Sequence, residues 1–261
     1  MYTLNRSWPW PSLAISMALS MPCAAQQALN RVDVGVAHSS LTQGQPDGQA
    51  AYVRASLPDG AGATYLELMH RRAFDQHAQL ASVGRVHDLD ADWLLGGFAT
   101  VSAPGDFLPH SKLDVTLTRK LLPGRTLLWM GGLSRAVNHH GYRDEAVQTA
   151  LTWLPPGPLW GELGLRHTTS RPGAVQGERY WATVGWRQAQ QRDVALRLES
   201  GQEGWSVLGN QANVVGFDST LWNLGWSEWL GERHGIKASI ERYRNPYYSR
   251  LTLDIAFFQQ F

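Results

Sequence analysis

Cysteine is almost absent from this 261-residue chain, and its one cysteine, Cys23, lies close to the N-terminus. The residues that follow it therefore cannot form a disulfide framework or a thiolate metal site, and a cysteine-free chain suits an oxidising compartment. A dominant charge is also lacking, because 23 Lys plus Arg face 22 Asp plus Glu. This balance gives no reason to expect nucleic acid or an acidic macromolecule as a partner.

Long apolar runs are the third absence. From residue 26 to residue 261, no uncharged apolar run approaches about eighteen residues, so no transmembrane helix is expected there. The first 25 residues hold one basic residue, Arg6, then a short apolar stretch over 12–21 and small residues ending at Ala25. This order predicts a secretory signal peptide over 1–25, whose cleavage leaves a mature domain over 26–261.

Two other interpretations of the N-terminus are open. A membrane anchor requires about twenty apolar residues, and the stretch over 12–21 is half as long. A lipoprotein acceptor at Cys23 requires small residues before the cysteine, whereas Met21 and Pro22 stand there. Both alternatives fit the sequence less well than a cleaved signal peptide.

The mature sequence contains a repeated alternation of apolar with polar or small residues. In the last segment, for example, Leu251, Leu253 and Ile255 alternate with polar residues, as in a strand whose two faces meet different environments. We expect fourteen such strands, near 29–38, 50–57, 63–72, 77–87, 91–101, 112–121, 125–137, 144–154, 158–168, 178–188, 193–201, 216–228, 234–243 and 249–261. The pattern predicts an all-β protein: a single transmembrane antiparallel up-and-down β-barrel of about 14 strands, with 12 possible, and both termini periplasmic.

The connections between these segments alternate in length, which favours a transmembrane barrel with tight periplasmic turns and longer extracellular loops. Short connections include 58–60, 123–124 and 155–157, and the longest connection is expected over 202–215, where it could fold inward. A soluble sandwich or lipocalin-like barrel is the alternative. Its strands are usually about five or six residues long, and it could not easily bury so many charges on the second face.

Aromatic residues support the membrane interpretation. Tryptophan favours the membrane boundary because its ring is apolar and its N–H needs a partner. The chain also ends in an alternating strand closed by Phe261, which we interpret as the signal read by the barrel assembly machinery. The predicted interfacial girdle at the periplasmic side consists of Trp93, Trp153, Trp160, Trp186, Trp226 and Trp229.

If the apolar face contacts lipid, the period of two directs the charged face into the lumen. One interpretation is that these charges only fill and brace the barrel, and the other is an aqueous pathway whose arginines select anionic or hydroxylated solutes. Glu162 is expected to pair with Arg179 or Arg187. The predicted lumen or pore residues are Arg54, Glu67, Arg71, Arg85, Arg135, Glu162, Arg166, Arg179, Arg187, Arg197, Glu199 and Glu241.

Several short motifs resemble the YaiO-like family of outer-membrane β-barrel proteins over about residues 30–261. They are 65–67 leading into 71–75, Phe107-Leu108-Pro109, Leu122-Pro123-Gly124 and the run from Glu162 to Arg166. The resemblance implies an outer-membrane barrel of this size in a Gram-negative cell envelope. It also implies an association with export of extracellular polysaccharide.

Three function classes follow. The first is a porin-like transport channel for small hydrophilic solutes, or an accessory to polysaccharide export, and the second is a non-conducting structural or receptor barrel. The third, a lipid-modifying enzyme, is not favoured, because no spacing joins Ser134 to His140 or to the histidines near His38 in a catalytic arrangement. We expect no cofactor and no metal site. Expected partners are outer-membrane lipid and lipopolysaccharide, the barrel assembly machinery, and saccharides or other small solutes, with no nucleic acid.

Overall fold

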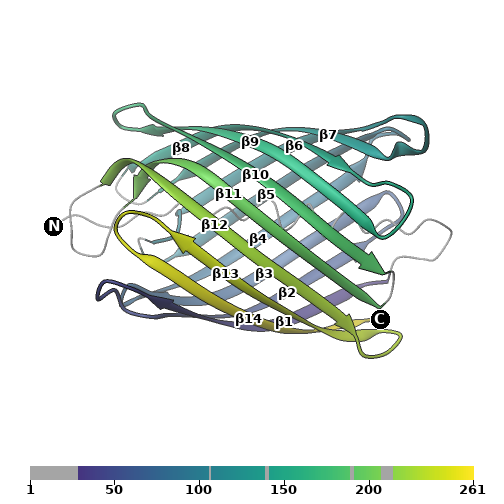
Figure 1. Ribbon diagram of the computed structural model, residues 1–261, viewed down its shortest axis with the longest axis horizontal. Helices are drawn as coiled ribbons and strands as arrows, with labels where there is room; N and C mark the ends of the chain where they lie inside the picture. The colour runs from purple at the N-terminus through teal and green to yellow at the C-terminus, as the bar shows by residue number, and fades with distance from the viewer. Residues whose placement is uncertain (1–28, 106, 139–140, 189–190, 207–213) are drawn as a thin grey trace.

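The computed structural model describes residues 29–105, 107–138, 141–188, 191–206 and 214–261, and the expected signal peptide lies outside them. The chain forms one closed barrel of strongly tilted strands (Figure 1). The strands are β1 (Arg31–Leu41), β2 (Gly48–Pro58), β3 (Gly62–Ala73), β4 (Gln76–Asp88), β5 (Trp93–Ala103), β6 (Ser111–Leu121), β7 (Leu127–Val137), β8 (Arg143–Trp153), β9 (Leu159–Arg171), β10 (Val175–Gln188), β11 (Arg192–Ser206), β12 (Val214–Trp229), β13 (His234–Arg244) and β14 (Ser249–Gln260).

Every strand pairs antiparallel with its neighbours in the sequence, and β1 pairs with β14 to close the ring. The closing ladder runs from Arg31 opposite Gln260 to Leu41 opposite Arg250. Closure pairs the backbone groups of both terminal strands, as the hydrocarbon interior of a membrane requires. The predicted single antiparallel barrel of fourteen strands is confirmed.

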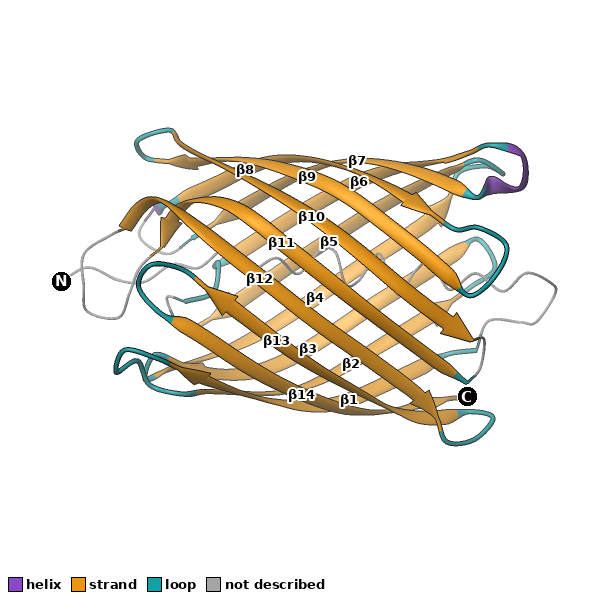
Figure 2. Ribbon diagram, viewed as in Figure 1, coloured by secondary structure: helices purple, strands orange, loops and turns teal. Residues whose placement is uncertain are grey.

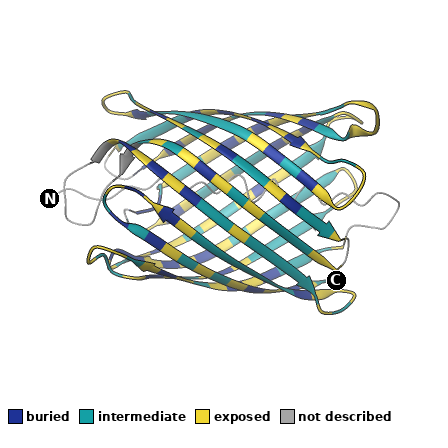
Figure 3. Ribbon diagram, in the orientation of Figure 1, coloured by how far each residue is buried: buried dark blue, intermediate teal, exposed yellow. Residues whose placement is uncertain are grey.

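The alternation in the sequence becomes two faces of the barrel wall, visible as alternating exposed and buried bands along the strands (Figure 3). The outward side chains are large and apolar: Leu68 is 64 % exposed, Leu133 63 % and Leu163 65 %. The intervening residues point inward and include buried charges such as Asp33 and Glu199. Because each strand has at least eleven residues, it is long enough to cross the hydrocarbon when tilted.

Tight turns join the strands at one end of the barrel. We call the end where β1 begins and β14 finishes the terminal end, and the opposite end the loop end. Arg31 lies opposite Gln260, so the first and last strands bring both chain ends to the terminal end. Its connections are short, including the 3₁₀ turn η1 (Pro123–Arg125) shown in Figure 2. In the β2–β3 turn, Gly60 has φ 80°, a left-handed conformation that glycine adopts without strain.

The expected contrast in connection length is wrong for several loops, because the strands continue further than the sequence indicated. Residues 74–75 alone join β3 to β4, both with positive φ, as in a two-residue hairpin turn. The predicted longest loop, 202–215, is shortened because β11 runs to Ser206 and β12 begins at Val214. Residues 207–213, where an inward fold was expected, lie outside the described residues. Within the described chain, no helix has the length and hydropathy to span a membrane.

Candidate functional site

The lumen wall is the candidate site, and most of the predicted pore residues lie on it. Their direction follows from the register, since opposite residues of paired strands share a face. Arg71 is 7 %, Glu162 6 % and Glu199 6 % exposed, although all three carry charge. The predicted residues that point inward are Arg54, Glu67, Arg71, Glu162, Arg166, Arg179, Arg187, Arg197, Glu199 and Glu241.

Two predicted pore residues, Arg85 and Arg135, are instead on the outer face. Arg85 shares a face with Val83, which is 51 % exposed, and Arg135 shares one with Leu133. Both residues lie near strand ends, where an outward arginine extends beyond the apolar belt into the polar interface. Arg85 Nη2 lies 2.7 Å from Asp59 Oδ2 of the β2–β3 turn. This hydrogen bond holds the pKa of the Asp59 carboxyl below its ordinary value.

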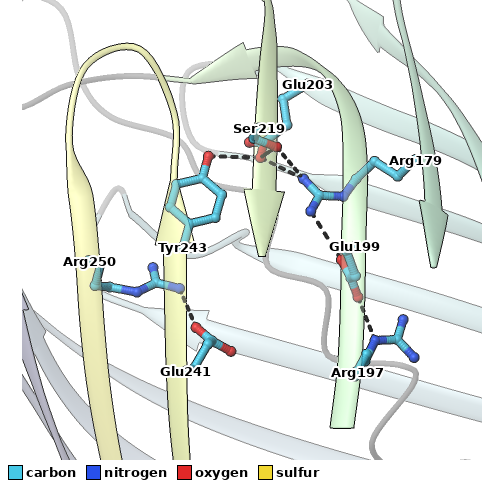
Figure 4. Close-up of polar contacts among 8 residues, drawn as sticks. All are labelled: Arg179, Arg197, Glu199, Glu203, Ser219, Glu241, Tyr243 and Arg250. Carbon is cyan, nitrogen blue, oxygen red and sulfur yellow. Dashed lines mark hydrogen bonds and ion pairs between the residues drawn. The ribbon is translucent and has the colours of Figure 1, made fainter. Parts of the chain in front are cut away.

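Arg179 is the centre of a polar network that crosses the wall from β10 to β13 (Figure 4). Its guanidinium contacts Glu203 at 2.6 Å and Glu199 at 3.0 Å. Glu203 also accepts hydrogen bonds from Ser219 Oγ at 2.6 Å and from Tyr243 Oη at 2.8 Å. The network therefore connects β10, β11, β12 and β13 through side chains in addition to the backbone ladder.

Glu162 extends the same network toward β8. Its carboxylate accepts hydrogen bonds from Trp181 Nε1 at 2.7 Å and from Thr152 Oγ1 at 3.0 Å, and Arg197 Nη1 lies at 3.4 Å. The expected pairing of Glu162 with Arg179 or Arg187 is therefore wrong. The register places Arg179 opposite Arg166 and turns Arg187 toward Asp193 at 2.7 Å.

A second part of the wall, formed by β1, β2, β3, β13 and β14, is also ion-paired. Lys237 Nζ lies 3.0 Å from Asp33 Oδ2, and Arg54 Nε lies 2.8 Å from Glu67 Oε1. The Arg54 side chain keeps 25 % of its surface exposed, compared with 13 % for Arg197 in the first network. Exposure varies within this second part of the wall, because the Arg250 side chain, paired with Glu241, is 5 % exposed.

Positive and negative charges are equally represented among the lumen-facing residues that the structure describes. The cations are Arg31, Arg54, Arg71, Lys112, Lys120, Arg166, Arg179, Arg187, Arg197, Lys237 and Arg250. The carboxylates are Asp33, Glu67, Asp88, Asp114, Asp144, Glu162, Asp193, Glu199, Glu203, Glu241 and Asp254. The wall is therefore polar without a net charge, rather than strongly cationic.

Apolar side chains from three connections fold inward at the loop end, which the sequence did not indicate. We call this group the mouth cluster: Phe74, Phe107, Leu108, Tyr247 and Tyr248. Phe107 is 1 % and Tyr248 2 % exposed, and the Phe74 and Tyr248 rings meet edge to face at 6.4 Å. The cluster covers the mouth next to β1, β3 and β4, because Leu41 and Leu80 pack against it.

The aromatic girdle is only partly where the sequence placed it. Trp93, Trp153, Trp186 and Trp226 lie at the terminal end on the outer face, and Trp153 is 54 % exposed. Trp129, which was not predicted, also lies there and is 38 % exposed.

Two predicted girdle residues instead point into the lumen. Trp160 is 8 % exposed, and its ring lies over Gly185, its direct partner on β10. Trp229 packs edge to face on the buried Phe258 at 4.8 Å. Position near a strand end therefore did not determine which face these two rings occupy.

Among the residues considered in the sequence that the structure describes, no catalytic group is brought together. Ser134 points into the lumen, where it accepts a hydrogen bond from Arg166 at 3.3 Å, and His139 and His140 lie outside the described residues. His38 and Ser40 are exposed on the outer face, 3.4 Å apart, while Ser39 faces the lumen and contacts Thr252. Among the described residues, no three His, Cys, Asp or Glu side chains are grouped to hold a metal ion.

Comparison with protein families gives a match to the YaiO membrane beta barrel domain over residues 29–204. This range covers more than half of the chain and includes the first ten strands. The chain belongs to the YaiO family. The resemblance in the sequence is thus confirmed, whereas a search of curated proteins gives no match.

Solved structures share the architecture of this YaiO-family barrel at very low identity. A monoaromatic hydrocarbon channel, CymD, has a TM-score of 0.60 at 7 % identity, with 90 % of this chain and 89 % of that chain covered. A bacterial polysaccharide outer membrane secretin has 0.55 at 8 %, covering 89 % and 98 %. Omp33 of Acinetobacter baumannii has 0.55 at 9 %, covering 90 % and 100 %. These similarities show that the fold is that of outer-membrane barrels.

Proposed function

We propose that this YaiO-family barrel is a narrow channel for small hydrophilic solutes, with saccharides as the expected class. The observation that supports it best is the lumen wall, which carries balanced charged side chains on all parts of the barrel and keeps charges such as Arg54 partly exposed. A polar wall with accessible charges favours water and hydroxylated solutes over apolar ones. The proposed role is not enzymatic.

The proposal includes orientation and assembly. We propose that the terminal end faces the periplasm, because both chain ends lie there and most of its turns are tight. Phe261 closes the outward series Leu251, Leu253, Ile255 and Phe257, and its N–H donates to the carbonyl of Asn30. This placement leaves the Phe261 ring 57 % exposed for recognition by the assembly machinery during insertion.

Conductance across a planar bilayer tests the channel. We expect small single-channel steps in KCl, and a reversal potential near zero in a KCl gradient because lumen cations and carboxylates are balanced. Liposome swelling with sugars of increasing size then gives the size limit. The folded state is verified in the same preparation by heat-modifiable gel mobility.

The competing function is a non-conducting structural or receptor barrel. The ion pairs around Arg179 and the mouth cluster favour it, since both fill space within the lumen. Folded protein that gives neither conductance steps nor sugar-dependent swelling would exclude the channel and leave this function. A role in polysaccharide export predicts that a deletion strain secretes less polysaccharide and that the wild-type gene restores it.

A further inference from the structure

Two arginines lie directly opposite each other on the outer face at the loop end. Arg143, the first residue of β8, is the register partner of Arg171, the last residue of β9. Like charges directly opposite on one face destabilise a strand pair. Among the strand pairs that the structure describes, this is the one place on the outer face where two arginines oppose each other. An anion between them would remove the repulsion.

The two arginines line a pocket rather than a flat surface. The pocket has a volume of 540 Å³ and is lined by Gly141, Tyr142, Arg143, Arg171, Pro172, Gly173 and Ala174. It lies between the β7–β8 connection and the β9–β10 connection, and both connections contribute residues to its lining. The site is shallow and open to the outside of the barrel.

The local charge is positive. Arg135 of β7 lies on the same face, opposite Glu145 of β8. Glu145 is the countercharge recorded near the pocket, with its Oε2 3.8 Å from Arg171 Nε and with both side chains about half exposed. Arg135, Arg143 and Arg171 therefore have one carboxylate near them among the described residues, that of Glu145. The cluster has room and charge for at least one further anion.

The position of the pocket relative to the apolar belt indicates the source of that anion. On β8 the outward residues are Trp153, Leu151 and Val147, and the charged positions begin immediately after them. Arg143 is four residues beyond Val147, about 13 Å along a strand that rises about 3.3 Å per residue. For a strand tilted by about 40°, this length along the strand is about 10 Å along the membrane normal. Arg143 therefore lies above the apolar belt, in the region of the lipid headgroups.

We propose that Arg143 and Arg171, with Arg135 beside them, bind a phosphate of a lipid headgroup in the outer leaflet, namely the phosphorylated sugar of lipopolysaccharide. Guanidinium groups contact phosphate oxygens through paired, charge-assisted hydrogen bonds. The acyl chains of the same lipid would contact the exposed belt at Leu133, Val147 and Leu163. The inference uses the orientation proposed above and is independent of whether the lumen conducts.

Lipid binding by the folded full-length barrel in detergent micelles tests the site. Bisphosphorylated lipid A is titrated and the bound lipid is counted by native mass spectrometry. We expect the double substitution Arg143→Gln with Arg171→Gln to weaken binding about tenfold or more, as the loss of charge-assisted hydrogen bonds predicts. The matched control is Arg242→Gln with Arg244→Gln on β13, two outward arginines at the same end that have no arginine opposite.

A second measurement compares the melting temperatures of the wild type and one single variant, without and with lipid A. In lipid-free micelles, Arg143→Gln alone should raise the melting temperature, because it removes a like-charge contact. With lipid A at saturation, the same variant should melt below the wild type. This single variant also keeps the test informative if the double variant does not fold, as judged by heat-modifiable gel mobility.

Several outcomes would overturn the proposal. Equal binding of dephosphorylated lipid A would show that phosphate is not recognised, and an equal loss in the β13 control would show a nonspecific effect of charge. Competition by inorganic phosphate at the same concentration as lipid A would assign the pocket to free phosphate instead. The proposal would also be contradicted if lipid A did not change which of the two proteins, wild type or Arg143→Gln, has the higher melting temperature.

Discussion

Glu162 shows how one buried charge is accommodated in the lumen wall. It is 6 % exposed and has three donors around it: the indole of Trp181, the hydroxyl of Thr152 and the guanidinium of Arg197. A buried carboxylate is tolerated only when it is paired and hydrogen-bonded. The Trp181 indole and the Thr152 hydroxyl donate to Glu162, whereas Arg197 also pairs with Glu199 at 2.6 Å.

Replacement of Glu162 by alanine should therefore destabilise the barrel. We expect Glu162→Ala to lower the free energy of unfolding by about 1–3 kcal/mol for each buried donor left without its acceptor, namely the Trp181 indole and the Thr152 hydroxyl. Urea titration of the folded band in heat-modifiable gels measures it. Glu228→Ala is the control, since the Glu228 pair with Arg192 lies on the outside, and it should leave unfolding nearly unchanged. An equal effect of both variants would contradict this role.

At the scale of strands, the lumen aromatics follow a rule that the sequence alone does not reveal. Tyr52, Phe98, Trp160, Trp181 and Phe258 each lie directly opposite a glycine of the neighbouring strand and cover it. A Cβ on Gly164 would come within 2.0 Å of the Trp181 ring. Glycine makes room for the ring inside the barrel, and the ring shields the backbone that glycine leaves bare.

The substitution Gly164→Ala tests this pairing. We expect it to destabilise the barrel by about 1–3 kcal/mol, the usual cost of overpacking, because the hydrogen bond to Glu162 holds the Trp181 ring in place. Gly97→Ala is the matched control in β5, where the added Cβ meets no atom within 4 Å. Urea unfolding of both variants measures the difference. Equal stability of the two would argue against the pairing.

The wrong sequence predictions for Trp160, Arg85 and Arg135 also concern which face of a strand a side chain occupies. Trp160 lies near a strand end, as a girdle residue does, but the glycine opposite it provides space on the inner face. Arg85 and Arg135 were assigned inward because they are charged, although counting from Val83 and Leu133 places them outward. For Arg85 and Arg135, the alternation counted from a neighbouring outward residue therefore determined the face, and residue type alone did not.

For the whole molecule, the mouth cluster is the feature that bears most on the proposed channel. The β5–β6 connection inserts Phe107 and Leu108 against Ala73, Phe74 and Ala78 inside the rim. Arg71 lies beneath, with its guanidinium carbon 5.7 Å from the centre of the Phe107 ring. The mouth cluster thus packs apolar side chains inside one side of the loop end, beside β1, β3 and β4.

Loosening of this cluster should widen the channel. We expect Phe107→Ser with Leu108→Ser to raise the single-channel conductance, because the connection loses the apolar contacts that hold it inside the rim. The control is Leu89→Ser in the β4–β5 connection, where the side chain is 52 % exposed at the terminal end. Equal conductance of folded wild type and double variant would show that the mouth cluster does not limit permeation.

The sequence by itself determined the fourteen strands and the closed barrel. A period of two sorts each segment into an apolar and a polar face, and membrane hydrocarbon allows no unpaired strand edge. It also placed ten of the twelve predicted charged pore residues on the inner face. Only the tertiary structure decided which charges pair, as Glu162 with Trp181, Thr152 and Arg197, and which rings turn inward, as Trp160. The physical reason is that pairing depends on register between strands, and loop contacts such as Phe107 with Phe74 join distant segments, so neither is encoded in local alternation.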